Sequence, residues 1–171
     1  MAEGLRLFFL RHGLADRDQY HGDDDDLRPL TMEGRRRMGL EADFIVGLAP
    51  GIDAVITSPL VRAVETAEIV ASRLGMAGTV TTDRRLGFGF DLPELAAMLA
   101  GLAADRRRIM IVGHEPSFSR VIGDLVGGAR VVMKKGALAR VDLVPGDEVR
   151  GRLMWLLQPR VLVGGERGWS G

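Results

Sequence analysis

The sequence predicts a three-layer α/β/α fold, in which a mostly parallel central sheet lies between two layers of helices. Three observations lead to this prediction. Short apolar runs alternate along the chain with longer stretches that carry apolar residues at helical spacing. This alternation is typical of parallel strands covered by helices on both faces. An apolar fraction of 46% and a mean hydropathy of +0.08 fit a globular protein with a hydrophobic core.

The length of 171 residues favours a single domain that spans residues 1–171. A chain of this size buries roughly 70% of the surface that its unfolded form exposes, which is enough for a real core. Neither an internal repeat nor a low-complexity linker divides the sequence. The glycine-rich tail over residues 159–171 is expected to be loosely ordered.

The first strand and helix follow from the first 48 residues. Residues 5–10 form an apolar run that predicts a buried strand. Residues 31–48 carry apolar side chains at helical spacing, which predicts a helix. Thr31 stands immediately before this pattern, and its hydroxyl suits the N-cap position.

A second strand and helix come next in the same order. Residues 53–57, DAVIT, predict a strand, and residues 58–74 predict the following helix. Ser58 is the expected N-cap, because Pro59 suits the first helical position. Residues 78–82 are a short run with β-propensity.

The second half of the chain continues the alternation. Helices are expected from Pro93 to about Ala104 and from Pro116 to about Val126, with the apolar strand RIMIV at residues 108–112 between them. Two later strands are expected at residues 138–143 and 153–157, because a turn-rich segment separates these apolar runs.

Charge and composition exclude several classes of protein. Lys plus Arg and Asp plus Glu number 23 each, so no net charge attracts nucleic acid or an acidic membrane. Cysteine is absent, which excludes disulfides and thiolate metal sites and suits a reducing compartment. Neither a signal-peptide pattern nor a membrane-length apolar run is present. We expect a soluble, cytoplasmic protein without nucleic-acid or membrane partners.

Two predicted strands end at histidines. FFLRHG places Arg11 and His12 after the first strand, and IMIVGHEP places His114 after a later one. Ligands of open α/β sheets bind beyond the carboxyl ends of the strands. One such histidine alone is more often a loop residue, but two of them, with an arginine beside the first, predict a shared site.

Arg62 is expected to face the same crevice. It follows Pro59 closely, so it lies in the first turn of its helix, where side chains lean back toward the preceding strand. A solvated surface position is the alternative. Two guanidinium groups, two imidazoles and helix N-termini together make a pocket for a tetrahedral, doubly charged anion. Adjacent arginines should also keep His12 neutral until the anion binds.

Three motifs in this order resemble a known family. LRHG follows the first strand, TSPLVRAVETA the second and VGHEP a later one, and RPLTMEG adds a further likeness. Together they resemble the histidine phosphatase superfamily, also called phosphoglycerate mutase-like, and above all its short SixA-type phosphohistidine phosphatases. The resemblance extends over about residues 5–157 and implies the phosphoglycerate mutase-like fold.

The resemblance implies a role for each matching residue. His12 would be the nucleophile that accepts the phosphoryl group. Arg11 and Arg62 would bind its oxygens, and His114 would bind them too and donate to them as charge develops. Water would then release phosphate from His12. Because the cations belong to the protein, neither metal nor cofactor is expected.

A general acid is harder to find in the sequence. Asp16, which follows the nucleophile loop, and Glu115, beside His114, are possible acids, with Asp91 and Glu94 as further candidates. Glu94 better suits the first turn of a helix. A phosphohistidine substrate would need no strong acid, because imidazole is a far better leaving group than an alkoxide. A short chain without a lid also favours a phosphorylated protein as substrate, although small phosphoesters stay possible.

Three functions remain in competition: a phosphohydrolase, a mutase-like isomerase of the same fold, and a non-catalytic phosphate-binding module. The isomerase needs a lid for which the chain has little room. The four residues at the expected site argue against the binding module. Residues 23–26, four consecutive aspartates near His21, are interpreted as a solvated loop rather than a metal site.

Overall fold

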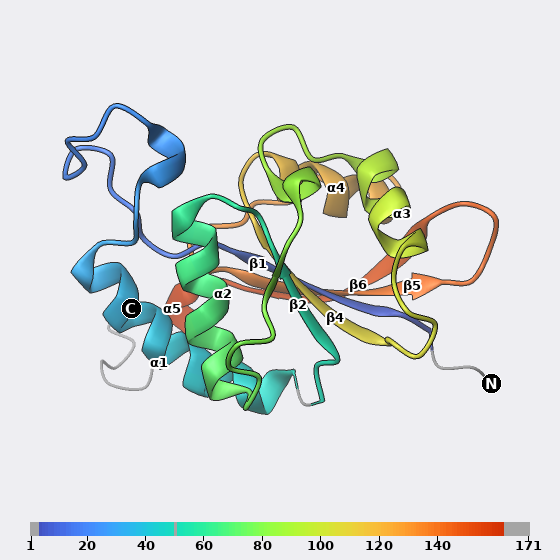
Figure 1. Cartoon of the computed structure of the whole chain (residues 1–171). Coiled ribbons are helices and arrows are strands. Elements are labelled where there is room, and N and C mark those ends of the chain that lie inside the picture. The colour runs from blue at the N-terminus through green and yellow to red at the C-terminus, as the bar shows by residue number, and fades with distance from the viewer. Residues whose placement is uncertain (1–3, 50, 163–171) are drawn as a thin grey trace, which may run out of the picture.

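The computed structural model describes residues 4–49 and 51–162. Within them the strands form one sheet in the order β3-β2-β4-β1-β5-β6. Figure 1 shows this sheet between two layers of helices. The strands are β1 (Arg6–Arg11), β2 (Ala54–Thr57), β3 (Thr81–Thr82), β4 (Arg108–Gly113), β5 (Leu138–Val144) and β6 (Arg150–Leu157).

Most of the sheet is parallel, as predicted. β2 pairs in parallel with β3 and β4, and β4 pairs in parallel with β1. β5 is antiparallel to both β1 and β6, so it alone runs against the other strands of the sheet. The pairing of Arg11 with Gly113 aligns the carboxyl ends of β1 and β4. The residues that follow, His12 and His114, therefore leave the sheet side by side.

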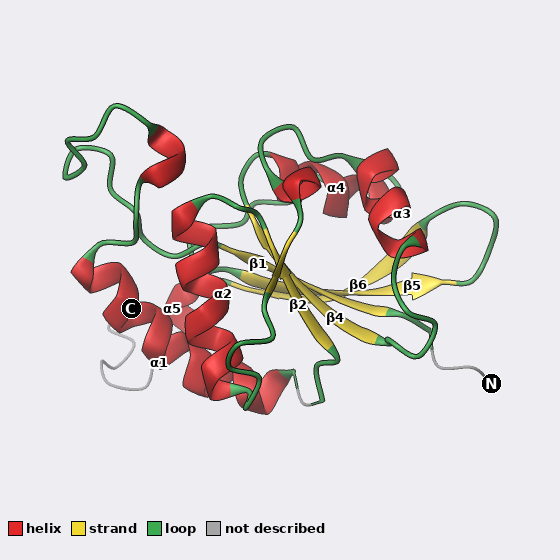
Figure 2. Ribbon diagram, in the orientation of Figure 1, coloured by secondary structure: helices red, strands yellow, loops and turns green. Residues whose placement is uncertain are grey.

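Helices cover both faces of the sheet, which confirms the three-layer fold (Figure 2). One layer holds α1, α2 and α5, and the opposite layer holds α3 and α4. Two short 3₁₀ helices, η1 and η2, were not predicted. The bounds are α1 (Met32–Leu48), α2 (Val61–Arg73), α3 (Leu92–Ala100), α4 (Ser117–Leu125), α5 (Pro159–Leu162), η1 (Asp25–Leu27) and η2 (Arg84–Leu86).

The hydrophobic core lies on both faces of the central strands. In β1, Phe9 packs in a cluster with Phe118 of α4, whereas Phe8 and Leu10 belong to a cluster with Met38 of α1. Successive side chains of a strand point to opposite faces. A strand covered on both faces must therefore be apolar throughout, which explains the continuous run in β1.

Two helix starts illustrate how local sequence sets the boundaries. Thr31 caps α1 as predicted, because its Oγ1 accepts a hydrogen bond from the Gly34 amide at 2.9 Å. The prediction for α2 was wrong by two residues, since the helix begins at Val61 and Leu60 is its N-cap. The buried Ser58 hydroxyl accepts from the Leu60 amide at 3.3 Å, within the turn that precedes the helix.

The predicted loose tail lies partly outside the described residues. Residues 159–162 form α5, and the rest of the tail is among the residues that the structure does not describe. In the described part of the chain, no helix combines the length and apolar character that a membrane crossing requires.

Candidate active site

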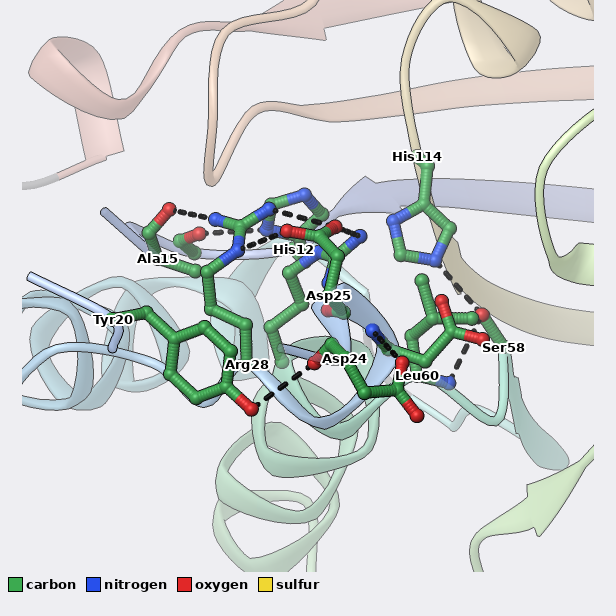
Figure 3. A network of polar contacts seen from close by, with 12 residues as sticks. His12, Ala15, Tyr20, Asp24, Asp25, Arg28, Ser58, Leu60 and His114 are labelled. Carbon is green, nitrogen blue, oxygen red and sulfur yellow. Dashed lines mark hydrogen bonds and ion pairs between the residues drawn. The ribbon is translucent and has the colours of Figure 1, made fainter. Parts of the chain in front are cut away.

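The two strand-end histidines meet at the carboxyl edge of the sheet. The ring centroids of His12 and His114 lie 5.1 Å apart, and the ring planes make an angle of 52°. Both side chains are buried, with 5% and 2% of their surfaces exposed. Figure 3 shows them facing one another. The predicted meeting of the two histidines is therefore seen in the geometry.

A hydrogen bond determines which nitrogen of His12 is available for chemistry. Nδ1 lies 2.8 Å from the carbonyl oxygen of Gly13. A carbonyl can only accept, so the Nδ1–H donates and the lone pair of the neutral ring lies on Nε2. Burial, together with nearby His114, Arg62 and Arg11, lowers the pKa of His12 to about 2. The neutral ring was expected from the arginines, but burial is the larger cause.

Ser58 orients the second histidine. The Nε2 of His114 lies 2.8 Å from the Ser58 Oγ, which already accepts from the Leu60 amide. The serine hydroxyl can donate its hydrogen to Nε2, and in that tautomer the ring proton lies on Nδ1. That buried nitrogen makes no hydrogen bond to the described residues and faces His12 in Figure 3. It is thus a donor that is available to an anion between the rings.

His114 is neutral as well. Burial, together with the charges of Arg62 and Arg11, lowers its pKa to about 3. Arg11 and Arg62 each lower the pKa of both histidines, so the four predicted residues lie close together at one site.

The two arginines reach the site from different elements. Arg11 ends β1, and its Nη1 donates to the Met133 carbonyl at 2.7 Å. Arg62 lies in the first turn of α2 and is only 1% exposed, so the alternative of a surface arginine is wrong. The Nε atoms of both are buried without a hydrogen-bond partner among the described residues. Guanidinium groups keep their charge when buried, so unpaired donors of this kind favour an anionic ligand.

One aspartate of the acidic loop belongs to the site, which corrects the interpretation of residues 23–26 as a wholly solvated loop. Arg62 Nη1 donates to the Asp25 carbonyl at 2.8 Å, and Arg62 Nη2 lies 3.4 Å from Asp25 Oδ2. Arg28 binds the same carboxylate through Nε at 2.9 Å and through Nη2 at 3.3 Å. Arg28 also donates to the Ala15 carbonyl. Figure 3 shows this pair beside the histidines.

An aromatic ring also borders the site. The centroid of Phe88 lies 5.3 Å from that of His114 and 5.6 Å from the Cζ of Arg62. Phe88 is nevertheless 63% exposed. The residue lies in the segment LGFGF, just after η2. The glycines on both sides of it are the one local sequence feature that indicates an unusual loop. Sequence reasoning did not identify it.

The candidate acids are engaged in local turns and caps. Asp16 accepts from the Asp18 amide at 3.0 Å and from Gln19 at 3.2 Å. Glu115 accepts from the Ser119 amide at 3.1 Å, in the first turn of α4. Asp91 caps α3 by accepting from the Glu94 amide at 3.0 Å, and Glu94 lies in the first helical turn as expected.

The described residues offer no obvious metal centre. Among them, no group of three or more His, Asp or Glu side chains is arranged to hold an ion. The positive charge of the site comes from guanidinium groups.

Comparisons with known proteins agree with this geometry. Residues 7–87 match the model of the histidine phosphatase superfamily (branch 1). An uncharacterized protein of Picosynechococcus sp. is 39% identical over 120 residues, which span 66% of this chain and 67% of that protein. Phosphohistidine phosphatase SixA of Escherichia coli is 27% identical over 157 residues, which span 91% and 94% of the two chains. A structure of the protein histidine phosphatase SixA complexed with tungstate matches with a TM-score of 0.81 and 26% identity, over 92% of this chain and 99% of that one.

Proposed function

The chain belongs to the histidine phosphatase superfamily, in its SixA branch, and is a phosphatase; we propose that it removes phosphoryl groups from phosphohistidine in proteins. In this proposal the reaction needs no metal and passes through a covalent phosphohistidine on His12. The similarity to the phosphohistidine phosphatase of Escherichia coli supports the choice of substrate.

The observation that carries the proposal is the state of the His12 ring. The ring is neutral, its Nδ1–H is held by the Gly13 carbonyl, and its Nε2 lone pair is left for attack. Neutral imidazole is a competent nucleophile toward phosphorus. A histidine that is buried but uncharged is therefore suited to form a bond rather than an ion pair.

The neighbouring groups suit the electrostatics of phosphoryl transfer. The transferring group passes through a loose transition state with its charge spread over three oxygens, so catalysis depends mainly on positioning and charge stabilisation. Arg11 and Arg62 each supply an N–H donor that has no partner among the described residues, and the Nδ1–H of His114 supplies a third. These donors are held in place before substrate binds, so little reorganisation is needed during the reaction.

Water completes the cycle. It attacks the phosphorus of phospho-His12, and the electron pair of the broken phosphorus–nitrogen bond returns to Nε2. Phosphate leaves, and the ring regains the neutral form that the Gly13 carbonyl favours.

The test compares substrates directly. We expect kcat/KM for a phosphohistidine protein to exceed that for phosphoserine and for 3-phosphoglycerate by at least ~100-fold, a difference of about 2.7 kcal/mol in transition-state binding. A preference for a small phosphoester would contradict the proposed substrate. Formation of 2-phosphoglycerate would instead identify an isomerase.

A further inference from the structure

Two features of the site take no part in the proposed phosphoryl transfer. They are the carboxylate of Asp25, 3.4 Å from Arg62 Nη2, and the exposed ring of Phe88, 5.6 Å from Arg62 Cζ. Both lie against a guanidinium group that is proposed to hold the phosphoryl group. A leaving group attached to that phosphorus is therefore within reach of both.

We propose that Asp25 and Phe88 form a leaving-group site that selects a protonated imidazole ring. The inference rests on the proposed function, because it assumes a phosphohistidine substrate and attack by His12. It assigns to the two residues the discrimination between phosphohistidine and other phosphoryl donors.

The contacts of Asp25 suit an acceptor rather than an acid. The two bonds from Arg28 hold the pKa of Asp25 below its ordinary value, and the charges of Arg62 and Arg17 act in the same direction. The carboxylate is thus ionised and cannot supply a proton. It has about four lone-pair positions, so it can accept from a further N–H while Arg28 stays bound.

Phe88 offers the surface that a flat cation prefers. The residue is 63% exposed although it borders the buried site, and its neighbour Gly89 has a positive φ of 89° that favours glycine. The face of an aromatic ring attracts cations through its quadrupole. An aromatic face and a carboxylate beside one pocket are complementary to an imidazolium, which is planar, cationic and an N–H donor.

The step that follows is balanced in charge. The Nε2 lone pair of His12 forms a bond to phosphorus, and the phosphorus bond to the substrate nitrogen breaks, with its electron pair going to that nitrogen. Because the distal substrate nitrogen already carries a proton, the leaving group is neutral imidazole rather than imidazolate. The positive charge moves to phospho-His12, whose Nδ1–H stays on the Gly13 carbonyl. Asp25 favours the protonated substrate ring and so favours this path.

Acetyl phosphate should respond in the opposite way. Its leaving group is acetate, which is already an anion, needs no proton and is not aromatic. An ionised Asp25 repels this anion and competes with the phosphoryl oxygens for Arg62. The ratio of the phosphorylation rates with phosphoimidazole and with acetyl phosphate therefore tests the proposed leaving-group site.

The experiment measures the rate of enzyme phosphorylation in single turnovers, with phosphoimidazole and acetyl phosphate as donors. We expect Asp25→Asn to slow the reaction with phosphoimidazole at least ~10-fold, the usual scale for one charge-assisted hydrogen bond, and to speed that with acetyl phosphate. Phe88→Leu should slow the reaction with phosphoimidazole by about 3- to 10-fold and affect the reaction with acetyl phosphate less. Asp23→Asn is the matched control, because it removes the same charge from an exposed position in the same loop.

A pH profile separates this role from a structural one. In the unmutated protein Asp25 stabilises the substrate imidazolium. Its removal should therefore shift the alkaline limb of the pH–rate profile for phosphoimidazole to lower pH. The alkaline limb of the profile for acetyl phosphate should stay in place. The charged groups that act on Asp25 are Arg28, Arg62 and Arg17. Circular dichroism checks that each variant is folded.

Two results would overturn the inference, and they are distinguishable. Equal losses with both donors in Asp25→Asn would mean that Asp25 only positions Arg62, and the proposed function would stand. An unmutated protein that accepts a phosphoryl group from acetyl phosphate but not from phosphoimidazole would overturn the proposed substrate together with the leaving-group site.

Discussion

At the scale of single residues, the site contains buried polar atoms that make no hydrogen bond to the described residues. Nδ1 of His114 and the Nε atoms of Arg11 and Arg62 are all buried without partners in the described part of the chain. Buried polar groups of this kind cost stability unless a ligand satisfies them. A bound phosphoryl group would supply the missing acceptors, so part of its binding free energy comes from this deficit.

Substitution of Arg62 is the sharpest test of whether guanidinium groups bind the phosphoryl oxygens. A guanidinium group binds two phosphoryl oxygens at once and lysine cannot, so Arg62→Lys should lower kcat/KM at least ~100-fold, or about 2.7 kcal/mol. Steady-state kinetics measure the loss. Arg73→Lys, at the exposed end of the same helix, is the control and should be close to the unmutated protein. Equal kcat/KM values for the two variants would contradict a role of Arg62 in binding the phosphoryl group.

At the scale of elements, α1 carries an unexpected buried acid beneath the site. Glu41 is 2% exposed, and a Cβ at Gly136 would lie only 2.5 Å from its Oε2. The Gly136 amide donates to the carbonyls of Arg11 and His12, both at 3.1 Å. Glu41 therefore packs against the loop that holds the end of β1. Helical periodicity predicted the buried face of α1 but not the presence of a carboxyl group on it.

The pH dependence of stability should report on Glu41. Burial raises its pKa from 4.5 to about 8, so the folded protein keeps a proton that the unfolded chain releases above pH 4.5. Stability therefore falls as pH rises through this window, by up to ~1.4 kcal/mol for each pH unit. We expect Glu41→Gln to flatten the decline in the free energy of unfolding between pH 7 and pH 8. In this range His12 and His114 are largely neutral in the unfolded chain.

Denaturant unfolding at several pH values measures this slope. Glu68→Gln, which changes an exposed glutamate of α2, should keep the slope of the unmutated protein. A slope that is the same in Glu41→Gln as in the unmutated protein would show that Glu41 is ionised in the folded state.

The elements also show which features the sequence could predict. β1 and β4 were found from their apolar runs, and the histidines from their place after those runs, since period and position are local properties. The contact of Arg62 with Asp25 joins residues 37 positions apart, and that of His114 with Ser58 joins residues 56 apart. Contacts of this kind depend on tertiary packing, so Asp25, Ser58 and Phe88 were missed or misread.

At the scale of the whole molecule, the sheet order explains why the site lies where it does. β1 and β4 are adjacent and parallel near the middle of the sheet, with β2 beside β4. Their carboxyl ends therefore deliver His12, His114 and the turn before α2 to one edge. Between α2 and β4 the structure has only β3, η2 and α3, which leaves little material for a closing lid.

Metal independence belongs to this scale, because it concerns how the whole fold supplies charge. Since Arg11 and Arg62 provide the cations, we expect activity to survive excess EDTA. Vanadate or tungstate should inhibit, because such oxyanions occupy a site built for a phosphoryl group. Phosphatase assays with and without chelator measure both effects. Activity that is lost in EDTA and restored by a divalent ion would contradict a metal-free mechanism.

The covalent role of His12 is the centre of the account, and rapid-quench labelling with a phosphate-labelled substrate tests it most directly. Peptide mapping should place the label on His12, and the bond should be acid-labile and base-stable, as phosphorus–nitrogen bonds are. His114→Ala should still become labelled there, roughly 10²- to 10³-fold more slowly, which is the usual loss for one donor to a developing charge. His12→Ala should show neither label nor turnover. A label that persists in His12→Ala, or that maps to His114 in the unmutated protein, would contradict the assignment.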